Sequence, residues 1–411
     1  MEVTVLDKKR TVVGDGINFW VKIKARVQIE KMEEMAKKVK EKSVVEDYKK
    51  IQEAYEKSQK DIEELKKQLA KAKDKKEKEK VEAKITDDER LFQANQWFEK
   101  GKKHYYNKEY DEAIEAITSA IALKPNFANV YYNRGVVYND KGQHDRAIED
   151  FNKVIALNPN FAQAYYNRGL AYGKKGQDDR EIEDYNKAIA LDPNYADAYT
   201  NRGVTYALSG NMGRAIEDYN KAIALDPNLA EAYYNRGIAH AHKGQLDRAI
   251  EDYNKAIALN PNYASAYTNR GGVYYNKGQL DRAIEDYNKA IALNPNLAQA
   301  YNNRGLAYYN KGQYDRAIED YNKAIALDPN DAQAYYNRGN AYYNKGQYDR
   351  AIEDYNKAIA INPNIAQAYT NRGVTYALSG NMGRAISDFQ KACDMGDENG
   401  CKNLQRALQK R

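Results

Sequence analysis

The 411-residue sequence has few of the residues from which catalytic and metal sites are usually built. It contains two cysteines, four histidines and eight prolines. His240 and His242 are two residues apart, a spacing that places them on different faces of a helix. We find no glycine-rich phosphate loop, no nucleophile elbow and no cysteine–histidine metal set. The sequence therefore predicts no catalytic residue, no metal site and no cofactor.

Long apolar runs and an excess of one charge sign are missing as well. No apolar run approaches the roughly 20 residues of a membrane-spanning helix. The 65 Lys and Arg residues are finely mixed with 59 Asp and Glu residues, for a formal net charge of +6. Even mixing gives no basic patch of the kind that binds nucleic acid. We therefore expect no transmembrane segment and no nucleic-acid partner.

The prolines are periodic. Each follows the previous one by 34 residues, from Pro125 to Pro363. Within one period, residues 298–310 and 314–327 have the spacing of two helices, and the second carries an apolar stripe at three- and four-residue steps. Lys-Gly-Gln separates the two helices, and its glycine ends the first. Asn330 is predicted to cap the next helix through its side chain.

The 34-residue period, with its recurring glycine, tyrosine, alanine, aromatic and proline positions, resembles the tetratricopeptide repeat of bacterial proteins. The resemblance covers nine repeats over residues 94–399. It implies an all-α fold, a right-handed superhelical solenoid of helix-turn-helix repeats whose first helices line the inner face. Because the last repeat needs cover, residues 400–411 are predicted to form a C-terminal capping helix.

An asparagine recurs two residues before each helix glycine. An asparagine of the same phase lines the inner face in the repeat domain of O-linked N-acetylglucosamine transferase, which holds extended peptides, so the resemblance implies a peptide-binding ladder. A carboxamide can donate and accept hydrogen bonds at once, and tyrosine adds contact area with a polar tip. The predicted peptide-binding residues are Asn133, Asn167, Asn201, Asn235, Asn269, Asn303, Asn337 and Asn371, with Tyr132, Tyr166, Tyr234 and Tyr336; Tyr275, Tyr309 and Tyr343 are further candidates on that face.

A structural role for the same asparagines is the alternative, in which each merely ties one helix to its neighbour. The arginines that follow them, from Arg134 to Arg372, are predicted to be structural, with their guanidinium groups paired to acidic residues of the second helices. Glu181 stands where the other repeats have a small alanine. We expect the third repeat to be loosely packed there unless this carboxylate reaches solvent.

The N-terminal segment differs from the repeats. Residues 17–29 alternate apolar and polar side chains as a half-buried strand does, and we expect residues 1–30 to form a short β-hairpin. The segment resembles the end of a small α/β domain of bacterial envelope and flagellar-assembly proteins, which implies a longer natural protein, with or without a signal peptide. Residues 31–93 are predicted to be a charged helical segment whose heptads, within residues 44–79, form either a coiled-coil homodimer or a helix lying on the first repeats.

The two cysteines, Cys393 and Cys401, are eight residues apart near the C-terminus. The stretch resembles cysteine-rich bacterial helical repeats, in which a disulfide joins consecutive helices. That resemblance implies a disulfide and an oxidising compartment, hence a periplasmic or envelope-associated protein if a signal peptide lies upstream. The alternative is a pair of reduced thiols in a cytoplasmic protein.

The sequence thus predicts a non-catalytic scaffold that binds an extended peptide or protein segment on the concave face of the solenoid. The alternative is a structural protein that assembles with copies of itself through its coiled coil and repeat surfaces. The partner in the first reading is a protein or peptide.

Overall fold

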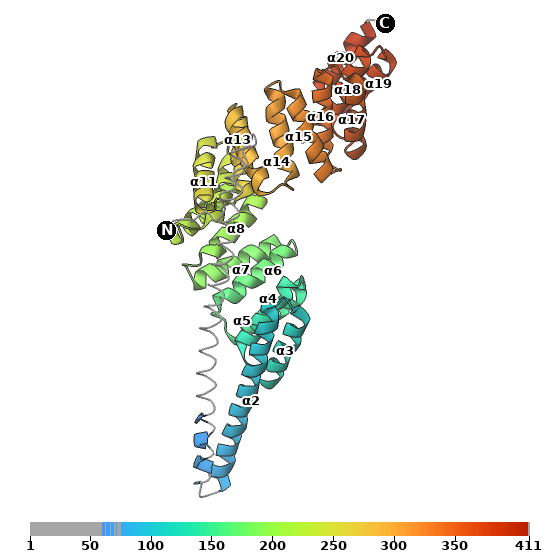
Figure 1. Cartoon of the computed structure of the whole chain (residues 1–411). Coiled ribbons are helices and arrows are strands. Elements are labelled where there is room, and N and C mark those ends of the chain that lie inside the picture. Colours follow the sequence, from blue (N-terminus) through green and yellow to red (C-terminus); the bar gives the residue numbers. More distant parts are fainter. Residues whose placement is uncertain (1–59, 62, 66, 70, 72–74, 410–411) are drawn as a thin grey trace, which may run out of the picture. The chain divides into compact units, whose positions relative to one another are not determined.

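The computed structural model describes residues 60–61, 63–65, 67–69, 71 and 75–409. It divides into two compact units, Met1–Pro227 and Asn228–Arg411. Every regular element among the described residues is a helix (Figure 1). The predicted all-helical solenoid of helix-turn-helix repeats is therefore confirmed. The expected β-hairpin of residues 1–30 and most of the heptad segment, 44–79, lie outside the described residues, so both stay predictions.

Helices of two kinds alternate along the chain. The even-numbered helices α2–α18 are the first of each repeat and are called A helices here, and the odd-numbered helices α3–α19 are the second and are called B helices. The first unit contains α2 (Lys75–Tyr106), α3 (Tyr110–Leu123), α4 (Ala128–Asp140), α5 (His144–Leu157), α6 (Ala162–Lys174), α7 (Asp178–Leu191), α8 (Ala196–Leu208) and α9 (Met212–Leu225). The second unit contains α10 (Ala230–His242), α11 (Leu246–Leu259), α12 (Ala264–Asn276), α13 (Leu280–Leu293), α14 (Ala298–Asn310), α15 (Tyr314–Leu327), α16 (Ala332–Asn344), α17 (Tyr348–Ile361), α18 (Ala366–Leu378), α19 (Met382–Asp394) and α20 (Glu398–Gln409).

The seventh repeat shows why this sequence folds into hairpins. Its helices α14 and α15 have the predicted bounds. Gly312 ends the turn between them with a φ of +72°, a backbone conformation that glycine adopts without a steric penalty. A Cβ at Gly305 would lie 2.7 Å from the ring of Tyr321, so only glycine lets the two helices approach this closely. Ala317 is fully buried at the same contact.

One predicted helix cap is wrong. Asn330 does not cap α16 with its side chain; Asp331 does, accepting hydrogen bonds from the backbone N–H groups of Gln333 and Ala334 at 2.9 and 3.1 Å. The backbone N–H of Asn330 instead donates to the Asp328 carboxylate at 3.0 Å, which closes the Pro329 turn. The asparagine belongs to the turn, and the residue after it begins the helix.

Helix α2 is one continuous helix of 32 residues. It joins the highly charged segment before residue 94 to the first helix of the first repeat. Ala94 is fully buried within it, and a Cβ at Gly101 would lie 2.5 Å from the side chain of Ile117 on α3. The first repeat is therefore packed in the same way as the others, although it lacks their Asn-Arg-Gly sequence.

Charged pairs link the turns of five repeats to the repeat before them. A lysine at the end of the A helix contacts an aspartate of the preceding B helix in the pairs Lys141–Asp111, Lys175–Asp145, Lys277–Asp247, Lys311–Asp281 and Lys345–Asp315. Serine takes the place of the lysine in two repeats, as Ser209 in the fourth and Ser379 in the ninth.

Glu181 lies at the junction of the third and fourth repeats, and its carboxylate is fixed by a hydrogen bond, so the loose packing expected there is not found. The side chain is half-buried, and the Tyr185 hydroxyl donates to its Oε1 at 2.8 Å. The required space comes from Gly173, where a Cβ would lie 2.4 Å from the carboxylate. Other repeats have larger residues at that position, so the glycine compensates for the glutamate.

The C-terminal helix α20 covers the last repeat. Its Ala407 is buried against Ala385 and Phe389 of α19. Cys393 and Cys401 form a disulfide across the turn between α19 and α20, with their Cα atoms 4.5 Å apart. None of the described helices is both long enough and apolar enough to span a membrane.

Candidate functional site

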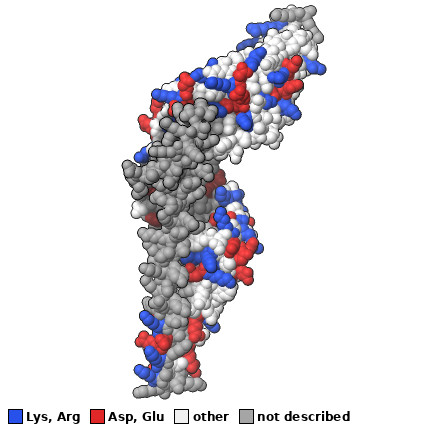
Figure 2. Space-filling model, in the orientation of Figure 1, with Lys and Arg blue, Asp and Glu red and all other residues white. Residues whose placement is uncertain are grey.

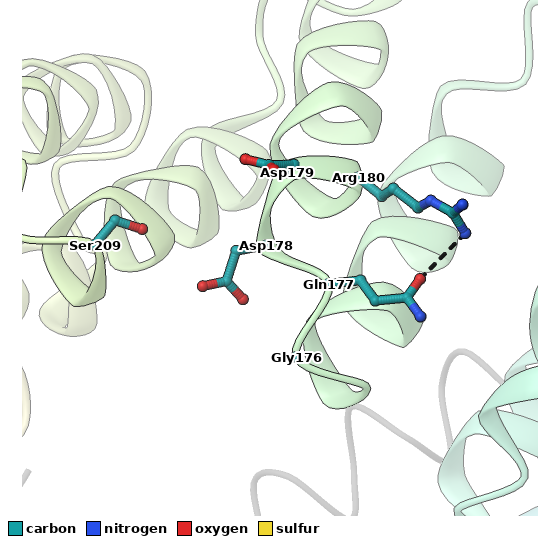
Figure 3. Close-up of a pocket in the computed structure, with 6 residues that line it drawn as sticks. All are labelled: Gly176, Gln177, Asp178, Asp179, Arg180 and Ser209. Carbon is teal, nitrogen blue, oxygen red and sulfur yellow. Dashed lines mark hydrogen bonds between the residues drawn. The ribbon is translucent and has the colours of Figure 1, made fainter.

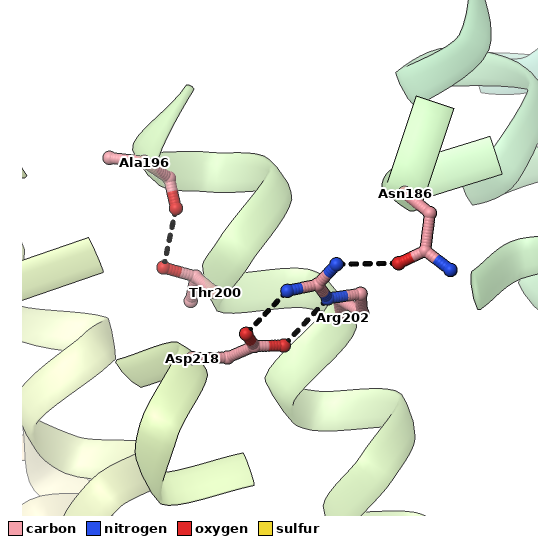
Figure 4. A network of polar contacts seen from close by, with 5 residues as sticks. All are labelled: Asn186, Ala196, Thr200, Arg202 and Asp218. Carbon is pink, nitrogen blue, oxygen red and sulfur yellow. Dashed lines mark hydrogen bonds and ion pairs between the residues drawn. The ribbon is translucent and has the colours of Figure 1, made fainter. Parts of the chain in front are cut away.

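The arginine of each Asn-Arg-Gly sequence is bound within its own repeat, as predicted. Arg202 donates from Nε and Nη2 to the two carboxylate oxygens of Asp218 on the following B helix, at 2.8 and 2.6 Å (Figure 4). Its Nη1 donates to Asn186 of the preceding B helix at 2.5 Å. The same bidentate pair recurs from Arg134 to Arg372. A bidentate guanidinium–carboxylate pair is strong and fixes geometry.

The aspartates of these pairs are buried. Burial raises the pKa of Asp184, while the hydrogen bonds from Arg168 oppose that rise. Removing the arginine would leave a buried carboxylate without its partner, which is costly. The arginines therefore hold each hairpin together and are not available to a ligand.

Asparagines of the predicted ladder connect neighbouring A helices within each of the two units. The Nδ2 of Asn167 donates to the hydroxyl of Tyr132, 35 residues earlier on the preceding A helix, at 3.0 Å. Equivalent bonds join Asn201 to Tyr166, Asn269 to Tyr234, and Asn371 to Tyr336, at 2.7, 3.0 and 3.1 Å, and Asn337 to the Asn302 oxygen at 3.1 Å. The asparagines thus tie neighbouring helices, and the tyrosines predicted to share their face are their partners.

Not every asparagine of the ladder makes this bond. Asn133 donates instead to the backbone oxygen of Asn129 in its own helix, at 2.7 Å. Thirty-five residues before Asn303 lies Thr268, whose hydroxyl donates to the Ala264 backbone oxygen at 3.0 Å. Asn235 and Asn303 are half-buried on α10 and α14.

A second row of tyrosine–asparagine bonds occurs in the second unit. Asn310 donates to the Tyr275 hydroxyl at 2.5 Å, and Asn344 donates to the Tyr309 hydroxyl at 2.7 Å. Both asparagines are exposed. Sequence reasoning named the tyrosines as candidates but missed these two asparagines. The signal was present, because each asparagine follows its tyrosine by the same 35 residues that separate the first row.

Behind this face lie the buried tyrosines of the B helices. The Tyr355 hydroxyl donates to Asn340 Oδ1 at 2.8 Å, and the same oxygen accepts from Asn371 at 2.9 Å. The hydroxyl of Tyr321, in the previous repeat, is the one buried side-chain polar atom without a hydrogen-bond partner in the described part of the chain. Leu306 occupies the position that Asn340 has in the next repeat.

A pocket of about 590 Å³ lies elsewhere, at the junction of the third and fourth repeats. Its lining includes Gln177, Asp178, Asp179, Arg180 and Ser209, and Arg180 donates to the Gln177 oxygen at 3.2 Å (Figure 3). The pocket lies where Ser209 replaces the bridging lysine of other junctions.

Comparison with known proteins identifies the repeats. Residues 101–142, 137–176, 177–210, 205–244, 271–312 and 305–346 match a family described as TPR repeat. Residues 230–263 and 332–365 match a second family described as tetratricopeptide repeat, and residues 252–285 and 354–387 match a third with the same description. No curated protein matches the chain.

Several solved structures are similar to the chain. A crystal structure of MamA is 38% identical over 40% of this chain and 96% of that one, with a TM-score of 0.37. The Cut9–Hcn1 hetero-tetramer of the APC/C is 17% identical over 77% of this chain and 76% of that one, with a TM-score of 0.52. YrrB, described as a TPR protein with an unusual peptide-binding site, is 29% identical over 46% of this chain and 96% of that one, with a TM-score of 0.39.

The matches to the first family alone cover more than half of the residues. The chain therefore belongs to the tetratricopeptide-repeat family, whose members generally mediate protein–protein interactions.

Proposed function

We propose that this protein is a non-catalytic scaffold that binds an extended peptide or protein segment on the surface formed by its A helices. The observation that carries the proposal is the row of asparagine side chains oriented by tyrosines of the preceding repeat. The bond to the tyrosine fixes the direction of the carboxamide. Asn167 and Asn371 use their second N–H as well, in bonds to the Gln163 backbone oxygen and to Asn340, and the carboxamide oxygen is then the group that can accept from a ligand. Groups held in place before binding lose less entropy when a ligand arrives.

The tying role of the asparagines and the binding role are compatible. Tyrosine and asparagine are residue types that recur at adaptable binding surfaces, since tyrosine gives area at low entropic cost and asparagine gives hydrogen bonds. The arginines of the Asn-Arg-Gly sequences are paired with aspartates. The ligand would therefore be bound by the neutral asparagine and tyrosine side chains.

Capture of partners from a lysate of the source cells tests the proposal. We expect the wild-type chain to retain a defined set of proteins, identified by mass spectrometry. A variant with Asn201, Asn235, Asn269 and Asn303 all changed to Ala should lose them while keeping its helical circular dichroism, because each substitution removes a polar group without changing a fully buried contact.

The control variant changes Lys187, Lys255, Lys323 and Lys357, which are exposed on B helices, to Ala. It should retain the same proteins as wild type. Equal capture by all three chains would place the binding surface elsewhere and contradict the proposal. Recovery of this protein alone would favour self-assembly.

A further inference from the structure

Charge is segregated between the two kinds of helix in the second unit. Each of the A helices α12, α14, α16 and α18 contains a single charged residue, its arginine. The B helix α13, by contrast, carries Asp281, Arg282, Glu285, Asp286 and Lys289, and α15 and α17 carry charges at the same positions. In the upper part of Figure 2, which contains α14–α18, charged side chains lie along the upper left border and at the right end, and an uncharged surface lies between and below them.

The four arginines do not give these A helices a positive surface. Arg270, Arg304, Arg338 and Arg372 have side chains only 16–19% exposed, and each forms the bidentate aspartate pair. Lys277, Lys311 and Lys345, just beyond the helix ends, are paired with aspartates of the preceding repeat. The A helices of the first unit and α10 differ, because they include Asp140, Lys174, Asp197 and Glu231.

The uncharged surface presents hydrogen-bonding groups in a regular order. Tyr275 with Asn310, and Tyr309 with Asn344, form pairs on successive A helices. A hydroxyl that accepts one hydrogen bond still has its own O–H to donate, and the carboxamide still has an oxygen that accepts. Each pair therefore offers a donor beside an acceptor, which complements the C=O and N–H of one peptide unit.

We infer that the surface formed by α12, α14, α16 and α18 binds an uncharged polypeptide segment in extended conformation, mainly through its main chain. This inference rests on the proposed function and adds the chemical class of the ligand. Interface centres are depleted in Lys, Glu and Asp and enriched in tyrosine. A charged ligand side chain would be desolvated here without a counter-charge, which disfavours it.

Fluorescence anisotropy with defined peptides tests the inference on the full chain. The probes are three labelled libraries of about 15 residues, long enough to cross several helices at about 3.3 Å per residue. All have blocked ends. One contains only Ser, Thr, Asn, Gln, Gly and Val, the second adds Lys at every third position, and the third adds Glu there. We expect the neutral library to bind most tightly, with less than a twofold change in affinity between low salt and about 0.5 M salt, because no charge pairs form.

A pair of charge variants locates the binding surface. Asn310→Asp with Asn344→Asp keeps a hydrogen-bond partner for Tyr275 and Tyr309 but places two carboxylates on the uncharged surface, and should weaken neutral binding by about tenfold or more. The control, Asn288→Asp with Asn322→Asp, adds the same charge on α13 and α15, where these side chains accept hydrogen bonds from Arg304 and Arg338. It should leave affinity unchanged.

The outcomes separate this inference from the proposed function. Tighter binding of the Lys or Glu library, or binding that collapses with salt, overturns the uncharged ligand while leaving a peptide-binding scaffold in place. Equal effects of both variant pairs also overturn it. Binding of a neutral oligosaccharide such as maltohexaose, with no binding of any peptide library, overturns both.

Discussion

Tyr321 and Tyr355 occupy the same position in consecutive repeats, but their hydroxyls have different surroundings. The Tyr355 hydroxyl donates to Asn340, whereas the Tyr321 hydroxyl has no partner, and its repeat has Leu306 at the sequence position of Asn340. Both side chains are almost fully buried. A buried polar group without a partner costs roughly 1–3 kcal/mol, and a made hydrogen bond contributes about 1 kcal/mol.

Tyr321→Phe and Tyr355→Phe should therefore shift stability in opposite directions. We expect Tyr321→Phe to be neutral or to stabilise its repeat by up to about 1 kcal/mol, and Tyr355→Phe to destabilise by about 1 kcal/mol. Native-state hydrogen exchange of the α15 and α17 amides measures both, because local stability can be read helix by helix. Equal losses in the two variants would show that Tyr321 has a partner in solution.

Contacts that recur in every repeat could be predicted from the sequence, whereas contacts that occur in a single repeat could not. The arginine–aspartate pairs and the bounds of α14 and α15 follow from spacing that recurs in every repeat. The cap at Asp331 and the lone hydroxyl of Tyr321 depend on one side chain each, and no period reveals them. The alternative that the asparagines tie neighbouring helices anticipated the asparagine–tyrosine bonds in general, but it named no partner for any asparagine, because side-chain direction across two helices requires the packed structure.

At the scale of elements, the junction between the third and fourth repeats departs most from the pattern. Glu181 replaces a buried alanine, Gly173 makes room for it, and Ser209 stands in place of the lysine that forms an ion pair at five other junctions. Sequence reasoning found the glutamate but expected loose packing, because the compensating glycine is eight residues earlier on the facing helix. The replacement of one residue was tolerated through a change in its neighbour.

The stability of this junction should depend on pH. Burial raises the pKa of Glu181, and the hydrogen bond from Tyr185 only partly offsets this. A carboxyl whose folded pKa is raised binds its proton more tightly in the folded state, so its contribution to stability is present at low pH and is lost as pH rises through the folded pKa. Glu181→Gln removes that dependence.

We expect Glu181→Gln to stabilise the junction at pH 7, by up to about 1 kcal/mol, since a neutral amide avoids burying a charge. The advantage over wild type should shrink as pH falls towards 4, where Glu181 becomes protonated. Thermal unfolding of both chains across this range measures the difference, with Glu183→Gln, on the same helix, as the control. A difference that grows towards low pH would contradict the assignment.

At the scale of the whole molecule, the disulfide closes a short loop between the last repeat and its capping helix. In the chain-entropy model, a disulfide that closes a loop of about eight residues raises the free energy of unfolding by roughly 2–3 kcal/mol. We predict that Cys393→Ser with Cys401→Ser lowers the protection of α19 and α20 amides by this amount and leaves α2–α9 unchanged. Hydrogen exchange measures the effect, and titration of the denatured native protein for two free thiols would show that the bond does not form in the cell.

Part of the surface on which helix α20 packs has a sequence that occurs twice in the chain. Residues 198–216 and 368–386 are identical in sequence. In the last repeat this stretch supplies Thr370, whose hydroxyl donates to Asp397 at the start of α20. Joining residue 216 directly to residue 387 would therefore create no new junction sequence and would give the fourth repeat the same cap. This deletion removes five whole repeats and keeps the native C-terminal helix. Gene duplication and deletion can therefore change the length of the binding surface without any change to the sequence of the C-terminal cap.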